Sequence, residues 1–248
     1  MDAAERKRTI VEIALPLFAR KGFAGTTTKE IAEAAGVSEA LLYRHFPTKA
    51  ALYEEILQIN CRVDSPLDQV DALTPSTATL VLMIHVLFRF VVFGDFCDPA
   101  TAKTRQRLVL HSLLDDGEYA RILWLRIAGE VLPTFTASVQ AARATGDMRP
   151  DGIAPANAFW FAHHVAAQIA HGRLTGESTV PYAGDIETVS DEATRFCLRG
   201  LGLTEEAIAE HYHPADLSAM IAGGATEVGL AGTARPSHAV GGAPGRLE

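Results

Sequence analysis

The sequence predicts an all-α protein, and two observations support this fold class. Apolar residues recur at spacings of three and four along almost the whole 248-residue chain, which is the period of an amphipathic helix. Alternating polar and apolar runs bounded by hairpin turns are absent, so no β-sheet is expected. Hydrophobic residues make up 48% and charged residues 21%, an ordinary balance for a globular protein of one or two domains.

The first two helices are predicted from their ends. Residues 4–21 have an apolar face, Gly22 can end this helix, and Pro16 inside it predicts a local irregularity. Glu30 follows Thr27 by three residues, which is the spacing of a capping box. A second helix is therefore expected at residues 28–35.

A tight turn and a third helix follow. Gly36 can end the second helix and Ser38 can cap the third, which is expected at residues 39–46, before Pro47. Thr48 can then cap a fourth helix. Six apolar residues have the spacing of a small core that clamps the second and third helices together: Ile31, Ala32, Ala35, Val37, Leu42 and Phe46.

The rest of the chain is predicted to form a helical body. Helices are expected at residues 76–93, 99–115, 118–144, 155–174, 186–201 and 205–211. The apolar run at residues 80–96 is short for a membrane span and contains His85 and Arg89, so we expect a buried core helix. Gly, Ala, Pro and Ser dominate from residue 222 onward, which predicts a mobile tail. The predicted domains are residues 1–50, 51–221 and 222–248.

Two short helices joined by a glycine turn are typical of a helix-turn-helix, although helical proteins that never bind DNA contain such hairpins too. The pattern from Thr27 to Leu52 is more specific: Thr-Thr-x-x-Ile-Ala-x-x-Ala-Gly-Val-Ser-x-x-x-Leu-Tyr-x-His-Phe-x-x-Lys-x-x-Leu. It resembles the signature of the tetracycline-repressor (TetR) family, and the resemblance covers about residues 8–54. It implies a homodimer with an N-terminal DNA-binding domain and a variable helical body. It also implies repression of operator DNA that a small-molecule effector relieves.

The resemblance and the side-chain chemistry together predict the DNA contacts. Thr28, Lys29, Tyr43, His45 and Lys49 resemble the DNA-contacting positions of the family, and their polar groups suit phosphate oxygens. Base contacts are expected at the start of the third helix, from Ser38, Glu39, Ala40 and Leu41, with Arg44 beside them. Glu39 can accept a hydrogen bond from cytosine, and Ala40, where the family often has glycine, can contact a thymine methyl group. Arg6, Lys7 and Arg8 either contact the DNA backbone or minor groove or form a charged, frayed terminus.

The formal net charge of -8 does not exclude DNA, because it is unevenly distributed. The first 60 residues carry eight basic and eight acidic residues, and the remainder carries 14 and 22. A neutral domain can bind DNA if its basic groups share one face. Three distant cysteines without zinc-finger spacing suggest reduced thiols, and the N-terminus lacks the apolar segment of a secretory signal. These features predict a cytoplasmic protein without membrane partners.

The body is expected to hold the effector and the dimer interface. A pocket is predicted among a few polar groups in an apolar wall: His85, Phe88, Arg89, His111, Trp124, Arg126 and Phe135. Arg89 needs a partner there, either an internal acid such as Asp115 or Glu130, or an anionic effector, and we favour the internal acid. The resemblance implies that residues 155–174 and 186–201 pair across a two-fold axis, with Phe161, His164, Gln168 and His171 at the interface.

Three alternatives follow from the same residues. Together with His85 or His111, the histidines of residues 163–171 could bind a metal, which would make the protein a metal-responsive regulator. Gly36 and Ser38 have the spacing of a nucleophile elbow, Gly-x-Ser-x-Gly, but Ala40 stands in place of the second glycine and no strand precedes the turn. A helical enzyme or ligand carrier would need a catalytic constellation, and we find none. No cofactor and no metal are therefore predicted.

Overall fold

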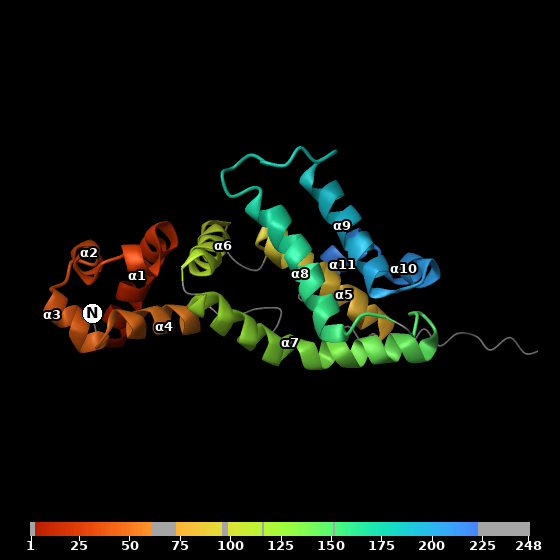
Figure 1. Cartoon of the computed structure of the whole chain (residues 1–248), viewed down its shortest axis with the longest axis horizontal. Helices are drawn as coiled ribbons and strands as arrows, with labels where there is room; N and C mark the ends of the chain where they lie inside the picture. The colour runs from red at the N-terminus through yellow and green to blue at the C-terminus, as the bar shows by residue number, and fades with distance from the viewer. Residues whose placement is uncertain (1–2, 61–72, 96–98, 116, 151, 223–248) are drawn as a thin grey trace, which may run out of the picture.

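The computed structural model describes residues 3–60, 73–95, 99–115, 117–150 and 152–222, and these residues fold into helices (Figure 1). The predicted tail, Cys61 and Cys97 lie outside the described residues. The helices are α1 (Ala3–Gly25), α2 (Thr28–Ala34), α3 (Glu39–His45), α4 (Lys49–Asn60), α5 (Thr77–Phe88), a π-helical segment (Arg89–Phe93), α6 (Pro99–Leu114), α7 (Glu118–Thr145), α8 (Pro155–His171), α9 (Ile186–Leu201), α10 (Glu205–His211) and α11 (Pro214–Ala222). The all-α prediction is confirmed for this part of the chain.

Helix α1 departs from regular geometry at Gly22 and not at Pro16, where we expected the irregularity. Pro16 is exposed and lies inside the helix, so its missing N–H costs one hydrogen bond on the solvent side. Gly22 has φ 72° and ψ 177°, a conformation open to a residue without a Cβ atom. The hydroxyl of Thr26 donates to the Gly22 carbonyl at 2.8 Å, which supplies that oxygen with a partner at the end of the helix.

The predicted caps of α2, α3 and α4 are present. The amide of Glu30 donates to Thr27 Oγ1 at 3.2 Å, and the amide of Thr27 donates to Glu30 Oε2 at 3.3 Å, which completes the capping box. Ser38 and Thr48 accept from the amides of Leu41 and Ala51 at 3.2 and 3.0 Å. Each such cap stabilises a helix by about 1 kcal/mol, a large share for helices as short as α2 and α3.

The buried apolar residues form two cores, one at each end of the molecule in Figure 1. The C-terminal core lies among α5, the π-helical segment, the second half of α7, and α8 to α11. Of the six predicted clamp residues, Ala35 and Val37 are partly buried and pack against the N-terminal core, and the other four are buried in it; the core also takes Leu108 from α6 and Tyr119 from α7. Its members are Ile10, Val11, Ala14, Phe18, Ala19, Ile31, Ala32, Leu42, Phe46, Leu52, Tyr53, Ile56, Leu108 and Tyr119. Helix α7 therefore belongs to both cores.

The apolar run predicted as a core helix is buried. It forms α5 and the π-helical segment, and Leu80, Val81, Ile84 and Phe88 are 1% exposed or less. Among the described helices, α7 alone has the length and apolar composition that a membrane span needs. Packing accounts for part of this composition, since Val131, Phe135, Val139 and Ala142 of α7 lie in the C-terminal core.

Candidate nucleic-acid interface

Helix α3 presents its predicted base-contacting residues to solvent. Its inner side is held by Leu42, which is 1% exposed, and by Phe46 directly after the helix, at 3%. On the outer side, Ser38, Glu39, Ala40 and Arg44 are exposed, Tyr43 is 44% exposed, and Leu41 and His45 are half-buried. Lys29 of α2 is also exposed. The turn at Gly36, with φ 62°, joins α2 to α3 so that one face of this short helix remains free.

A small polar network connects α2 with α3 on this surface. The hydroxyl of Thr28 donates to Glu39 Oε2 at 3.3 Å, and it lies 3.2 Å from the Tyr43 hydroxyl. Thr28 is the first residue of α2, whereas Glu39 and Tyr43 lie one turn apart on α3. The network therefore orients the Glu39 carboxylate, which is the group we expect to accept a hydrogen bond from a base.

Lys49 differs from the expected phosphate contact, because its ammonium group already has partners in the protein. Lys49 Nζ donates to the carbonyls of Phe23 and Thr26 at 2.8 and 3.1 Å and lies 4.2 Å from the centre of the Phe23 ring. Carbonyls at a helix C-terminus lack amide partners and attract cations. In this structure Lys49 therefore holds the start of α4 against the end of α1.

Part of the N-terminal basic run is also paired within the protein. Lys7 Nζ lies 2.8 Å from Glu55 Oε2 and 5.5 Å from the centre of the Phe46 ring. Arg8 Nε lies 3.4 Å from Glu12 Oε1, and both side chains are largely exposed. The structure thus adds a third interpretation of this run to the two predicted from the sequence, because Lys7 fastens α1 to α4.

The residues predicted for an effector pocket are not gathered at one place. Phe88 and Phe135 are 1% and 0% exposed and belong to the C-terminal core. His111 of α6 instead lies against α1, where a Cβ atom at Gly22 would be 3.5 Å from His111 Nδ1. Arg126 pairs with Glu130 one turn away on α7, at 2.7 Å. Spacing along a helix indicated which residues face inward, but not which neighbour each of them faces.

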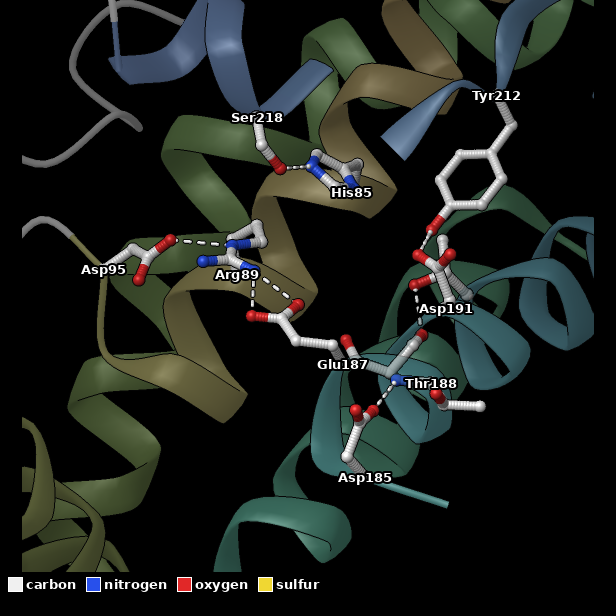
Figure 2. A network of polar contacts seen from close by, with 11 residues as sticks. His85, Arg89, Asp95, Asp185, Glu187, Thr188, Asp191, Tyr212 and Ser218 are labelled. Carbon is white, nitrogen blue, oxygen red and sulfur yellow. Dashed lines mark hydrogen bonds and ion pairs between the residues drawn. The ribbon is translucent and has the colours of Figure 1, made fainter. Parts of the chain in front are cut away.

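Arg89 has internal acidic partners, although not the two that we expected. Figure 2 shows its guanidinium group between Asp95 and Glu187, with Nε 2.7 Å from Asp95 Oδ2 and Nη1 2.8 Å from Glu187 Oε2. Asp95 follows the π-helical segment and Glu187 lies in the first turn of α9, so the pairs tie these segments together. The prediction of an internal ion pair is confirmed, but the two acids named as examples, Asp115 and Glu130, are not the partners, because sequence order does not reveal that α9 packs beside α5.

His85 is buried next to this network. His85 Nε2 lies 3.0 Å from Ser218 Oγ of α11, and its ring meets the Tyr212 ring edge-on at 5.9 Å between centres (Figure 2). The Tyr212 hydroxyl donates to Asp191 Oδ1 at 2.8 Å. Burial, and secondarily the nearby Arg89 cation, lower the pKa of His85 to about 4. The side chain is therefore neutral at pH 7 and cannot attract an anionic effector there.

The low pKa of His85 predicts that the protein loses stability in mild acid. Above pH 6.5 the side chain is neutral in the folded and in the unfolded chain. Between pH 6.5 and about 4 the unfolded chain binds a proton that the folded chain does not. The free energy of unfolding should therefore decrease as the pH is lowered through this range. Urea unfolding at pH 7 and pH 5 measures this, and His85→Gln should reduce the loss. An identical loss in the variant and in the parent would contradict this role of His85.

The predicted dimer interface lies on an exposed strip of α8. Phe161 is 55% exposed, His164 and Gln168 are exposed, and His171 is half-buried. Phe196 on the neighbouring helix α9 is 67% exposed, and the sequence analysis missed it. The buried side of α9 is formed by residues such as Thr194, Cys197 and Leu201, and helical spacing places Phe196 away from the centre of that side, which is the signal that could have indicated it.

The histidines of α8 do not form a metal site with their neighbours. Over the described parts of the chain, no group of three or more His, Cys, Asp or Glu side chains is arranged to hold a metal ion. The rings of His163 and His164 instead contact Trp160.

Within the described residues, α2 and the exposed α3 are joined by the turn at Gly36 and anchored in the N-terminal core, which is the arrangement of a helix-turn-helix. Residues 10–56 match the family described as "Bacterial regulatory proteins, tetR family". The regulator AcrR of Shigella flexneri is 30% identical over 122 residues, which are 48% of this chain and 52% of AcrR. The chain thus spans about half the length of this relative. The similarity to this family thus lies in the N-terminal helices, α1 to α4.

Two solved structures extend the likeness in fold to the helical body. A tetR-family regulatory protein from Rhodococcus RHA1 has a TM-score of 0.59 at 19% identity, over 81% of this chain and 98% of that one. AibR, solved "in complex with isovaleryl coenzyme A and operator DNA", has a TM-score of 0.58 at 18% identity, over 80% of this chain and 100% of that one. The described chain thus has the two-part fold of these regulators.

Proposed function

We propose that the protein is a homodimeric transcriptional regulator that represses by binding operator DNA and is released by a small-molecule effector. The observation that carries this proposal is the exposed face of α3, with Glu39, Ala40, Tyr43 and Arg44 outside and Leu42 anchored inside. A helix held in this way can enter the major groove, where base edges are distinguishable. The protein would act in the cytoplasm, without catalysing a reaction.

The division of α7 between the two cores suggests how an effector acts on DNA binding. Leu108 and Tyr119 join α6 and the start of α7 to the N-terminal core, while residues 131–142 of α7 pack in the C-terminal core. A ligand that shifts α7 in the body would move α1 to α4 with it. In a dimer this changes the separation of the two α3 helices, which must match major grooves about 34 Å apart.

The proposal is tested by selecting bound duplexes from a randomised DNA pool and measuring their affinity by fluorescence anisotropy at several salt concentrations. We expect an enriched inverted repeat and an affinity that falls steeply with salt, because basic side chains displace counterions from the phosphates. Binding that is absent at low salt, or equally strong for every sequence in the pool, would overturn the proposal.

Lys29 and Glu39 should contribute to DNA binding in different ways. Lys29→Ala should weaken binding to all duplexes by a similar factor and reduce the slope of log affinity against log salt by about 1, because a phosphate contact is lost. Glu39→Ala should instead alter the selected base at one position in each half-site. The control is Lys103→Ala, which removes the same charge from an exposed position on α6 and should leave the slope unchanged. Unaltered base selection by Glu39→Ala would contradict the assignment of Glu39.

A further inference from the structure

Four nitrogen-containing rings lie together where α7 passes α8. The rings of Trp124 and Trp160 are 6.3 Å apart between centres and meet edge to face, at 62°. His164 lies 6.3 Å from Trp124, and His163 lies 5.5 Å from Trp160 and 5.6 Å from His164. We call these four residues the ring cluster. It joins α7 and α8, which contact each other and meet at a steep angle in Figure 1.

The ring cluster occupies the transition between the two cores. Leu123, next to Trp124 on α7, packs against the N-terminal core, whereas Ile127 and Trp160 pack against the C-terminal core. Neither tryptophan is fully buried, and His164 is exposed in the single chain, where it also lies on the strip of α8 predicted for the dimer interface. Large aromatic surface that stays partly open beside a core is characteristic of binding sites, because a ligand can bury what the protein leaves accessible.

His163 contributes a polar atom that lacks a partner. Its Nδ1 atom is covered from solvent and has no hydrogen-bond partner among the described residues. Burial, with smaller effects from His164 and His171, lowers the pKa of His163 to about 4, so the imidazole is neutral at pH 7. Leaving a covered polar atom without a hydrogen bond destabilises the folded protein. Such a cost is understandable where a ligand supplies the missing partner.

We propose that the ring cluster binds a planar, uncharged aromatic compound that carries a hydroxyl group. Its ring would pack against Trp124 and Trp160, as aromatic rings do in edge-to-face pairs. Its hydroxyl would bond to His163 Nδ1 after the side chains that cover this atom move aside. A hydroxyl can donate and accept, so it satisfies either tautomer of the imidazole. The compound is uncharged because the burial that keeps His163 neutral also disfavours a charged ligand beside it. This inference rests on the proposed function, in which the compound is the effector.

The chain contains two tryptophans, and both belong to the ring cluster, so intrinsic tryptophan fluorescence reports on this site alone. The probes are p-cresol and toluene, which differ by one hydroxyl, with excitation at wavelengths beyond the absorption of both. We expect a saturable change with p-cresol at an affinity about three- to tenfold higher than that of toluene, the range of one hydrogen bond.

Variants separate the hydrogen bond from the packing. His163→Phe should remove the preference for p-cresol over toluene, and His163→Gln, which keeps a hydrogen-bonding group, should retain part of it. His211→Phe makes the same change on α10, away from the ring cluster, and should keep the preference. Circular dichroism confirms that each variant is folded. Equal affinity of the folded parent for the two probes, or tighter binding of tetramethylammonium than of p-cresol, would overturn the inference.

Operator binding is measured separately, so that failure of the inference differs from failure of the proposed function. Saturating p-cresol should weaken operator binding by the parent protein and not by folded His163→Phe. If the parent binds the operator but p-cresol does not change its fluorescence, the inference is wrong and the DNA-binding function stands. If p-cresol binds as described but no duplex is bound, the proposed function is wrong and the ligand site stands.

Discussion

Tyr119→Ala should lower the free energy of unfolding by about 3–5 kcal/mol, the usual cost of removing a large buried aromatic side chain. Tyr119 stands on α7 but is 1% exposed in the N-terminal core, where its ring lies 5.8 Å from that of Tyr53 on α4. Urea unfolding, followed by circular dichroism, measures the change. The same substitution should weaken operator binding, because α4 loses the contact that holds it against the body.

The matched control for Tyr119→Ala lies on the same helix. Leu125 is 61% exposed on α7, and Leu125→Ala should change the free energy of unfolding by about 0.5 kcal/mol or less. Comparable losses in the two variants would mean that α7 responds to any truncation. A loss below about 1 kcal/mol for Tyr119→Ala would show that α1 to α4 are stable without the body. This result would contradict a core that α6 and α7 share with α1 to α4.

Sequence signals predicted the N-terminal helices well because those signals are local. The capping box of Thr27 and Glu30, the positive φ of Gly36 and the cap Ser38 each act within a few residues. The same reasoning placed the domain boundary at residue 50, since nothing in the spacing of α6 and α7 indicates which core they join. Leu108 and Tyr119 contact residues from α1 to α4 that are more than 50 positions away.

The errors in the body have the same physical origin. The partners of Arg89 depend on how α9 crosses α5. In the N-terminal domain, the carbonyl partners of Lys49 likewise depend on how α1 ends against α4, while its phosphate contact stays a prediction. Helix α11 was not predicted, because it is short and its composition runs directly into the small residues that follow. It nevertheless supplies Ser218 to His85. Long-range packing therefore decides which predicted pocket residues meet, and helical periodicity alone cannot predict it.

Phe161→Asp should raise the dissociation constant of the dimer by about 10²–10⁴ and thereby weaken operator binding. We propose that Phe161 of α8 and Phe196 of α9, which are 55% and 67% exposed, meet the same helices of a second copy. Burying a phenylalanine side chain contributes about 1.5–3 kcal/mol, and two-fold symmetry counts every residue twice. One substitution thus removes about 3–6 kcal/mol from the association, which corresponds to that change in dissociation constant.

Sedimentation equilibrium of the parent and of the variants measures this association. Phe196→Asp should act in the same direction as Phe161→Asp, because both side chains lie on adjacent helices of the proposed interface. Leu114→Asp places the same charge on α6 at a leucine that is 85% exposed, and it should leave the dimer intact. A monomeric parent at micromolar concentration, or variants as dimeric as the parent, would exclude this face as the interface. The two α3 helices would then need another way to bind two successive grooves, since one short helix on its own makes too few phosphate contacts for tight operator binding.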